Sequence, residues 1–265
     1  MTGKREPEAA TAMKTLVSAL LLILLTGPAA FAQATGQLWG DVILERPGTH
    51  RLVYLLGLEP KVLVYAPAND PGWWAIDVLP GADYVVNKWF DVSGELTTAY
   101  TKQTNDLNSF ELTARAGLRF HLTSRDLRVT SRGLLGREKP SKRRVVLRDY
   151  LRVEQRNFFY NTDKPGSSTW RVRNRVEVQY PLNRERTSMD GARYLLTDWE
   201  WFIPMGDPSE RFANSQRIRA GLGYRRDARL RFEALYMWTR SRNTAAEDFT
   251  SSSHTIDFRL VWIRR

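Results

Sequence analysis

The stretch Trp170-Arg171-Val172-Arg173-Asn174-Arg175-Val176-Glu177-Val178-Gln179-Tyr180 changes the character of its side chain at every step. One phase is aromatic or β-branched apart from Asn174, and the other phase is entirely charged or amide. A period of two places the phases on opposite faces of a strand, whereas a helix would scatter the arginines around its surface. Similar alternation recurs from residue 33 to the end, so the sequence predicts an all-β protein.

Twelve segments carry strand patterning, and their ends are defined to about three residues. After residue 32 no apolar stretch is long enough for a transmembrane helix. The lengths, the alternation and the aromatic ends fit a single transmembrane antiparallel up-and-down β-barrel of about 12 strands, with a range of 10 to 14. Pro60, Pro80 and Pro204 remove ladder donors, so we expect them at strand ends or bulges. The predicted strands are 37–46, 50–65, 73–87, 89–102, 107–121, 126–137, 144–161, 168–181, 193–203, 214–225, 229–242 and 253–263.

The predicted turns conflict with a count of twelve. Bacterial barrels have short periplasmic turns and longer outer loops. With twelve strands and both termini in the periplasm, the turn at 226–228 falls inside, but those at 87–88 and 123–125 fall outside. Either a strand between 126 and 192 is miscounted, or a terminal segment is not part of the wall.

The first 32 residues read as an N-terminal extension followed by a secretory signal. Met13-Lys14 opens a short basic start, an apolar run follows at 16–25, and Ala30-Phe31-Ala32 is a small-x-small cleavage site. The apolar run is too short to span a bilayer. We therefore expect cleavage after Ala32 and an exported barrel of residues 33–265.

Composition narrows the function classes. The chain has no cysteine, which excludes a lipoprotein anchor, a disulfide framework and a thiol metal site or nucleophile. Its formal net charge is +11, and residues 33–265 keep about +10 because the first 32 carry three basic and two acidic side chains. Such an excess suits nucleic acid, anionic lipid or an anionic solute. Export argues against nucleic acid.

Several strand phrases carry a family resemblance. They are Gln37-Leu38-Trp39-Gly40-Asp41, Arg152 to Arg156, Trp170 to Leu182, Asp198 to Phe202, and Asn214 to Tyr224. Together they resemble an outer-membrane barrel family catalogued as domain of unknown function 2490, over most of residues 37 to 263. The resemblance implies a barrel in the outer membrane, and it implies no activity or catalytic residue.

The candidate site is a charge network on the inward phase of the predicted barrel. Opposite side chains on adjacent strands lie close enough to pair, and the arginine fork binds carboxylates bidentately. In one hypothesis the network is a structural plug that replaces a hydrophobic core. In the other, excess arginine leaves a net positive interior that favours small anions; at ten to twelve strands side chains can still occlude the channel. The network comprises Arg148, Arg152, Glu154, Arg156, Arg171, Arg173, Arg175, Glu177, Arg217, Arg219, Arg231, Glu233, Asp257 and Arg259.

Catalysis finds little support. His254 beside Ser251, Ser252 and Ser253 is the only suggestive cluster, and a Ser-rich loop with a lone histidine is far more often a solvated turn. There is no Gly-x-Ser-x-Gly, phosphate-binding loop, His-x-x-x-His or dense carboxylate set, so we predict no enzyme, metal or cofactor. The expected partners are outer-membrane lipid and lipopolysaccharide, the barrel-assembly machinery during insertion, and small anionic solutes if the lumen is open.

Two other readings remain. One is a membrane-embedded hydrolase acting on lipid or lipopolysaccharide. The other is a soluble periplasmic ligand-binding barrel, in which the apolar phase would face inward and the arginines outward.

Overall fold

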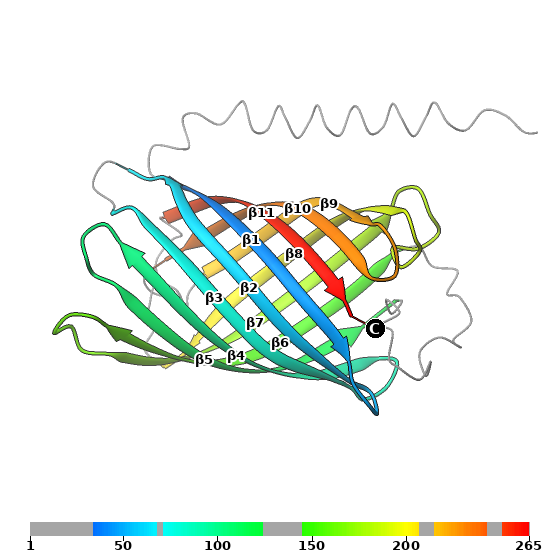
Figure 1. Ribbon diagram of the computed structural model, residues 1–265, viewed down its shortest axis with the longest axis horizontal. Coiled ribbons are helices and arrows are strands. Elements are labelled where there is room, and N and C mark those ends of the chain that lie inside the picture. Colours follow the sequence, from blue (N-terminus) through cyan, green and yellow to red (C-terminus); the bar gives the residue numbers. More distant parts are fainter. Residues whose placement is uncertain (1–33, 68–70, 124–144, 207–214, 243–250, 265) are drawn as a thin grey trace, which may run out of the picture.

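The structure is a closed β-barrel (Figure 1). It is a computed structural model that describes residues 34–67, 71–123, 145–206, 215–242 and 251–264. These residues form eleven strands and no helix, and so no helix that could cross a membrane. The strands are β1 (Ala34–Pro47), β2 (Leu52–Tyr65), β3 (Trp73–Val85), β4 (Phe90–Gln103), β5 (Ser109–His121), β6 (Val146–Tyr160), β7 (Ser167–Pro181), β8 (Ala192–Met205), β9 (Ser215–Arg225), β10 (Leu230–Ser241) and β11 (Ser251–Ile263).

The strand count lies within the predicted range, and each of the eleven strands has a predicted counterpart whose ends agree within three residues. The twelfth predicted strand, 126–137, lies outside the described residues. The strands on either side of it, β5 and β6, pair directly with each other. The all-β barrel predicted from alternation is therefore confirmed.

The barrel closes at one parallel seam. Strands that follow each other in the chain pair antiparallel, as predicted, but β1 pairs parallel with β11 from Ala34↔Ser252 to Glu45↔Ile263. An odd number of alternating strands makes the first and the last run in the same direction, which an up-and-down barrel of twelve would not do. The arrowheads of β1 and β11 point to the same end of the barrel (Figure 1).

The odd count resolves the conflict between the tight turns. Three four-residue connections, 48–51, 86–89 and 226–229, lie at one end, together with the connection 182–191, the end of β5, the start of β6 and the last residues of β11. We call this the turn end. The opposite end, here called the loop end, carries the connections 104–108 and 161–166, the start of β1, and the strand ends that flank 66–72, 206–214 and 242–250.

The outward phase of the strands is apolar. Large aliphatic and aromatic side chains on this phase are exposed on all eleven strands, whereas most of their neighbours in sequence are buried or half-buried. Outward aromatic residues recur at both ends, ten residues apart on four strands: Trp74 and Tyr84, Phe90 and Tyr100, Phe110 and Phe120, and Trp170 and Tyr180. These residues border the outward surface near each end of the barrel, and we call the outward surface between the two sets the belt. Asn174, the polar exception in its strand, lies on the belt, and its Nδ2 donates to Asp149 Oδ1 at 2.7 Å.

Two of the three prolines lie inside strands, which corrects the expectation that they mark strand ends or bulges. Pro60 is within β2, and the pairing of β1 with β2 skips Gly40 and Asp41 opposite it. Pro80 is within β3, and pairing with β4 is interrupted beside it. Each proline therefore coincides with a local gap in the ladder on one side, as its missing N–H requires. Pro204 is close to the end of β8, as expected.

Candidate functional site

The inward phase of the barrel is charged. All fourteen residues of the predicted network lie on this phase of β6, β7, β9, β10 and β11, where they are buried or half-buried. A soluble barrel with apolar residues inside and arginines outside would have the reverse arrangement. The structure brings the predicted residues together partly through the predicted carboxylates, Glu154 and Glu233 above all, and partly through acidic residues that the predicted network does not include.

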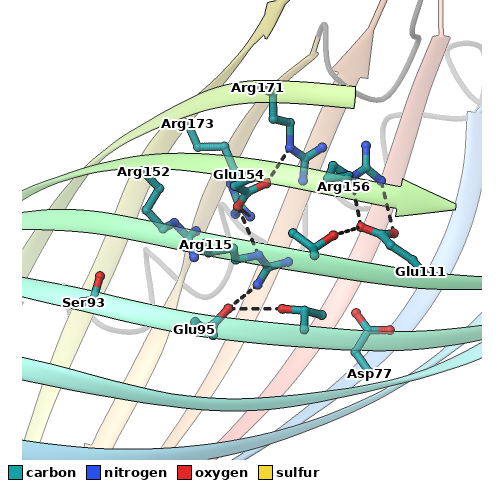
Figure 2. Close-up of polar contacts among 12 residues, drawn as sticks. Asp77, Ser93, Glu95, Glu111, Arg115, Arg152, Glu154, Arg156, Arg171 and Arg173 are labelled. Carbon is teal, nitrogen blue, oxygen red and sulfur yellow. Dashed lines mark hydrogen bonds and ion pairs between the residues drawn. The ribbon is translucent and has the colours of Figure 1, made fainter. Parts of the chain in front are cut away.

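Glu154 is the centre of one cluster (Figure 2). Its side chain is 0% exposed. Arg171 Nε donates to its Oε2 at 2.6 Å, Arg173 Nη1 donates to its Oε1 at 2.8 Å, and Arg115 Nε lies 3.3 Å from Oε1. Arg115 also pairs with Glu95 on the neighbouring strand. One carboxylate therefore holds arginines from β5 and β7 against β6.

Glu200 on β8 is the centre of a second cluster and is equally buried. Arg173 Nη2 donates to its Oε1 at 2.7 Å, while Arg217 Nη1 and Arg152 Nη2 donate to it at 3.3 and 3.4 Å. Arg173 thus bridges the two buried glutamates. This arrangement satisfies the condition under which buried charges are tolerated, namely that each is paired and hydrogen-bonded.

A third group of ion pairs lies near the seam. Arg259 on β11 donates from Nε to Asp41 Oδ2 on β1 at 2.6 Å and from Nη1 to Glu233 Oε2 on β10 at 2.9 Å. Glu233 also accepts from the Tyr194 hydroxyl at 2.6 Å. A single arginine therefore ties the last strand to both of its neighbours.

Two inward aromatic rings each carry three guanidinium groups. The guanidinium carbons of Arg171, Arg173 and Arg217 lie 4.6 to 5.1 Å from the centroid of Phe202. Those of Arg119, Arg152 and Arg175 lie 4.7 to 5.5 Å from the centroid of Tyr150. Both distances are within the range of cation–π attraction. The rings fill space between arginines that would otherwise repel one another.

The inward charges balance when all of them are counted. The described strands place fourteen carboxylates and fourteen lysines or arginines on the inward phase. The described strands therefore give the interior no net charge, unlike the second hypothesis, because the predicted network left out ten of these carboxylates. The positive excess of the chain comes from residues outside the inward phase.

The balanced charges are separated in space. The inward residues of β1 to β4 hold seven carboxylates and one lysine, a formal charge of −6, and we call them the acidic wall: Asp41, Glu45, Glu59, Lys61, Asp77, Asp83, Asp91 and Glu95. The inward residues of β6 to β9 hold nine arginines and four carboxylates, a formal charge of +5, and we call them the basic wall: Arg148, Arg152, Glu154, Arg156, Arg171, Arg173, Arg175, Glu177, Asp198, Glu200, Arg217, Arg219 and Arg225. In the closed strand order the two walls face each other, with β5 on one side and β10 and β11 on the other.

A cavity of about 950 Å³ lies between the walls. Its lining reaches the loop end through Trp73, Gln103 and Ser253. On the basic wall it includes eight arginines but only one carboxylate, Glu177, because Glu154, Asp198 and Glu200 do not reach its surface. On the acidic wall it includes six carboxylates and Lys61. The separation of charge is therefore sharper at the cavity surface than in the walls as a whole.

The turn end is lined differently. The inward residues there include an apolar layer, each member at most 7% exposed: Val53, Val85, Val146, Tyr194, Val261 and Ile263. None of them lines the cavity. The cavity therefore lies between this apolar layer and the loop end.

His254 lies on the outward phase of β11. Its Nδ1 pairs with the hydroxyl of Tyr236 on the neighbouring strand, and the two rings stack with their centroids 5.9 Å apart. In a Ser-His-Asp triad this nitrogen donates to the orienting carboxylate, and the hydroxyl of Tyr236 takes that place here. Within the described parts of the chain, no group of three or more metal-binding side chains is arranged to hold an ion.

Comparison with known proteins gave one result. A family model described as "Protein of unknown function (DUF2490)" matches residues 37–250. No curated protein and no solved structure matches the chain.

Proposed function

The chain belongs to the DUF2490 family of proteins of unknown function, and we propose that it is a passive outer-membrane β-barrel whose charged lumen admits small solutes. The surface of the belt carries this proposal. A closed barrel satisfies every backbone group without water, as a hydrocarbon environment requires.

The belt has the dimensions of a bilayer. On β3, β4, β5 and β7 the aromatic residues that border the belt lie ten positions apart in the strand. At about 3.3 Å per residue and a tilt of about 40°, this corresponds to roughly 25 Å along the barrel axis, the height of the apolar band in outer-membrane barrels. Trp and Tyr are the residues that mark membrane interfaces. A continuous exposed apolar surface of this height supports a membrane environment.

The route to the membrane follows from the first residues of the chain. The predicted signal and its cleavage after Ala32 lie outside the described residues and stay a prediction. In this proposal the chain is exported, inserted by the barrel-assembly machinery, and surrounded by phospholipid and lipopolysaccharide. The turn end then faces the periplasm and the loop end faces outward, because short turns are periplasmic in bacterial barrels.

The lumen suits a passive role. Its charges are fixed by ion pairs that span neighbouring strands, and the apolar layer at the turn end narrows the path through the barrel. Solutes therefore enter the cavity from the loop end, and small anions meet the basic wall there. The proposal assigns no catalysis to His254, whose ring nitrogen is held by Tyr236.

Two experiments test the proposal together. Protein refolded in detergent and transferred to phospholipid vesicles is expected to float with the vesicles on a density gradient and to resist extraction with carbonate. In planar bilayers we expect far less conductance than an unobstructed barrel of this size would give. Protein that stays soluble without detergent would contradict the membrane location, and a large ohmic conductance would contradict the narrowed lumen.

A further inference from the structure

The two charged walls make the cavity a polar slot with opposite signs on its two sides. Eight arginines face it from the basic wall and six carboxylates from the acidic wall. These charges are held in place by ion pairs within the walls, by ion pairs from Arg115 and Arg119 on β5 and Arg259 on β11 to carboxylates of the acidic wall, and by contacts to Tyr150 and Phe202. The field across the cavity is therefore a fixed property of the fold.

A field of this kind selects solutes by the arrangement of their charges. An anion is attracted by the basic wall and repelled by the acidic wall, and a cation is attracted by the acidic wall and repelled by the basic wall. Neither ion therefore gains electrostatic energy from both walls. A solute with a carboxylate at one end and an ammonium group at the other gains from both walls. It also replaces the water that both walls lose when it enters.

The width of the barrel sets the length of such a solute. Eleven strands about 4.8 Å apart and tilted by about 40° close into a cylinder roughly 22 Å across between facing backbones. Long inward side chains from both walls leave a gap of roughly 10 Å at its centre. The charges of an α-amino acid are too close together to span that gap. The termini of an extended tripeptide, at about 3.3 to 3.6 Å per residue, are far enough apart.

We propose that the cavity binds short zwitterionic peptides, with the carboxyl terminus on the basic wall and the amino terminus on the acidic wall. This inference rests on the proposed function, because it names the class of solute that enters the lumen.

Two residues can make these contacts with little loss to the ion pairs that hold the walls. Arg175 lines the cavity, its Nε has no hydrogen-bond partner, and among the described residues no carboxylate lies within ion-pair distance of it. Glu59 also lines the cavity and pairs with Lys61 at 3.0 Å, while Lys61 is held independently by Asp77. Arg175 therefore contacts the Tyr150 ring but takes part in no ion pair among the described residues, and the pairing of Lys61 with Asp77 lets Glu59 turn to a ligand.

Calorimetric titration of the detergent-solubilised protein tests the inference with four probes. They are trialanine, N-acetyl-trialanine, trialanine amide and alanine, which carry both charges, only the negative charge, only the positive charge, and both charges close together. We expect trialanine to bind at least tenfold more tightly than each of the others.

Single-charge variants assign the ends of the peptide. Arg175→Gln is expected to weaken trialanine and N-acetyl-trialanine about tenfold and to leave trialanine amide unchanged. Glu59→Gln is expected to weaken trialanine and trialanine amide and to leave N-acetyl-trialanine unchanged. Arg226→Gln removes a charge from an exposed turn, away from the cavity, and serves as the matched control.

Each outcome has a definite meaning. Equal binding of trialanine and N-acetyl-trialanine would reduce the cavity to an anion site and overturn the inference, as would the absence of heat from protein that retains a barrel's circular dichroism spectrum. These results would leave the outer-membrane proposal standing, since vesicle flotation decides that separately. Protein that binds trialanine but does not float would overturn only the membrane location.

Discussion

Replacing Glu154 by glutamine removes one charge from the centre of the network while keeping the shape of the side chain. The carboxylate is 0% exposed and has Arg171 at 2.6 Å, Arg173 at 2.8 Å and Arg115 at 3.3 Å. Arg173 keeps Glu200 and Arg115 keeps Glu95 in the variant, but Arg171 Nε loses the carboxylate it donates to. Removing one member of a buried ion pair costs about 3 to 5 kcal/mol.

Guanidinium titration of protein refolded into phospholipid vesicles, followed by tryptophan fluorescence, measures this loss. The control is Glu95→Gln, because the Glu95 side chain is 22% exposed and its partner Arg115 keeps Glu154. This variant removes one charge-assisted hydrogen bond from a partly exposed group and is expected to cost less, about 1 to 2 kcal/mol. Adding Arg171→Met to Glu154→Gln should restore part of the stability, since both charges are then gone. Equal losses for the two single variants would refute the claim that Glu154 organises the lumen.

Three further results are expected. Leu96→Arg, at the middle of the belt on β4, should destabilise the protein in vesicles by about 2 to 4 kcal/mol. Val92→Arg, close to the aromatic residues that border the belt at the turn end, should cost about 1 kcal/mol or less. Equal costs would argue against a bilayer around the belt. Gly223→Ala should cost about 1 to 3 kcal/mol, because a Cβ there would lie 2.1 Å from Tyr194 Cζ, whereas Gly94→Ala, with no atom within 4 Å, should be close to neutral in the same titration. In the turn 226–229, the backbone N–H groups of Arg229 and Leu230 donate to the Asp227 carboxylate and lower its pKa from 3.8. Both hydrogen bonds should therefore persist at pH 3.8 and be lost only as the pH falls further and the carboxylate is protonated. An Arg229 amide resonance that titrates at or above pH 3.8 would contradict this prediction.

Alternation in the sequence was sufficient to predict most of the barrel wall. In the segment from Trp170 to Tyr180 the side chain facing each way can be assigned from the period of two alone, and the structure places the strand at 167–181. The strand count could not be settled in the same way. The turn at 123–125 resembles the other turns in composition. The strands before and after 124–144 pair directly with each other, but no feature of the sequence near that segment predicts this pairing.

The charge network was harder to predict because its geometry depends on register. Glu200 belongs to a phrase quoted for its resemblance, Asp198 to Phe202, but its role becomes visible only when pairing places it opposite Arg175 on one side and Arg217 on the other. The acidic wall was missed because its carboxylates occur one or two to a strand. They do obey the period of two, as Asp91 and Glu95 do on β4, so a count of the inward phase over every strand would have found them.

The orientation of the two faces is the central claim, and neighbouring residues on β2 test it most directly. Because the chain has no cysteine, Leu58→Cys and Glu59→Cys each provide a single attachment point for a small fluorophore, at the same height on the belt and on opposite faces. In vesicles containing nitroxide-labelled lipid, the fluorophore at position 58 is expected to emit at shorter wavelength and to be strongly quenched by the lipid, while that at position 59 is quenched only by a water-soluble agent. Lipid quenching at position 59, or at neither position, would contradict the account.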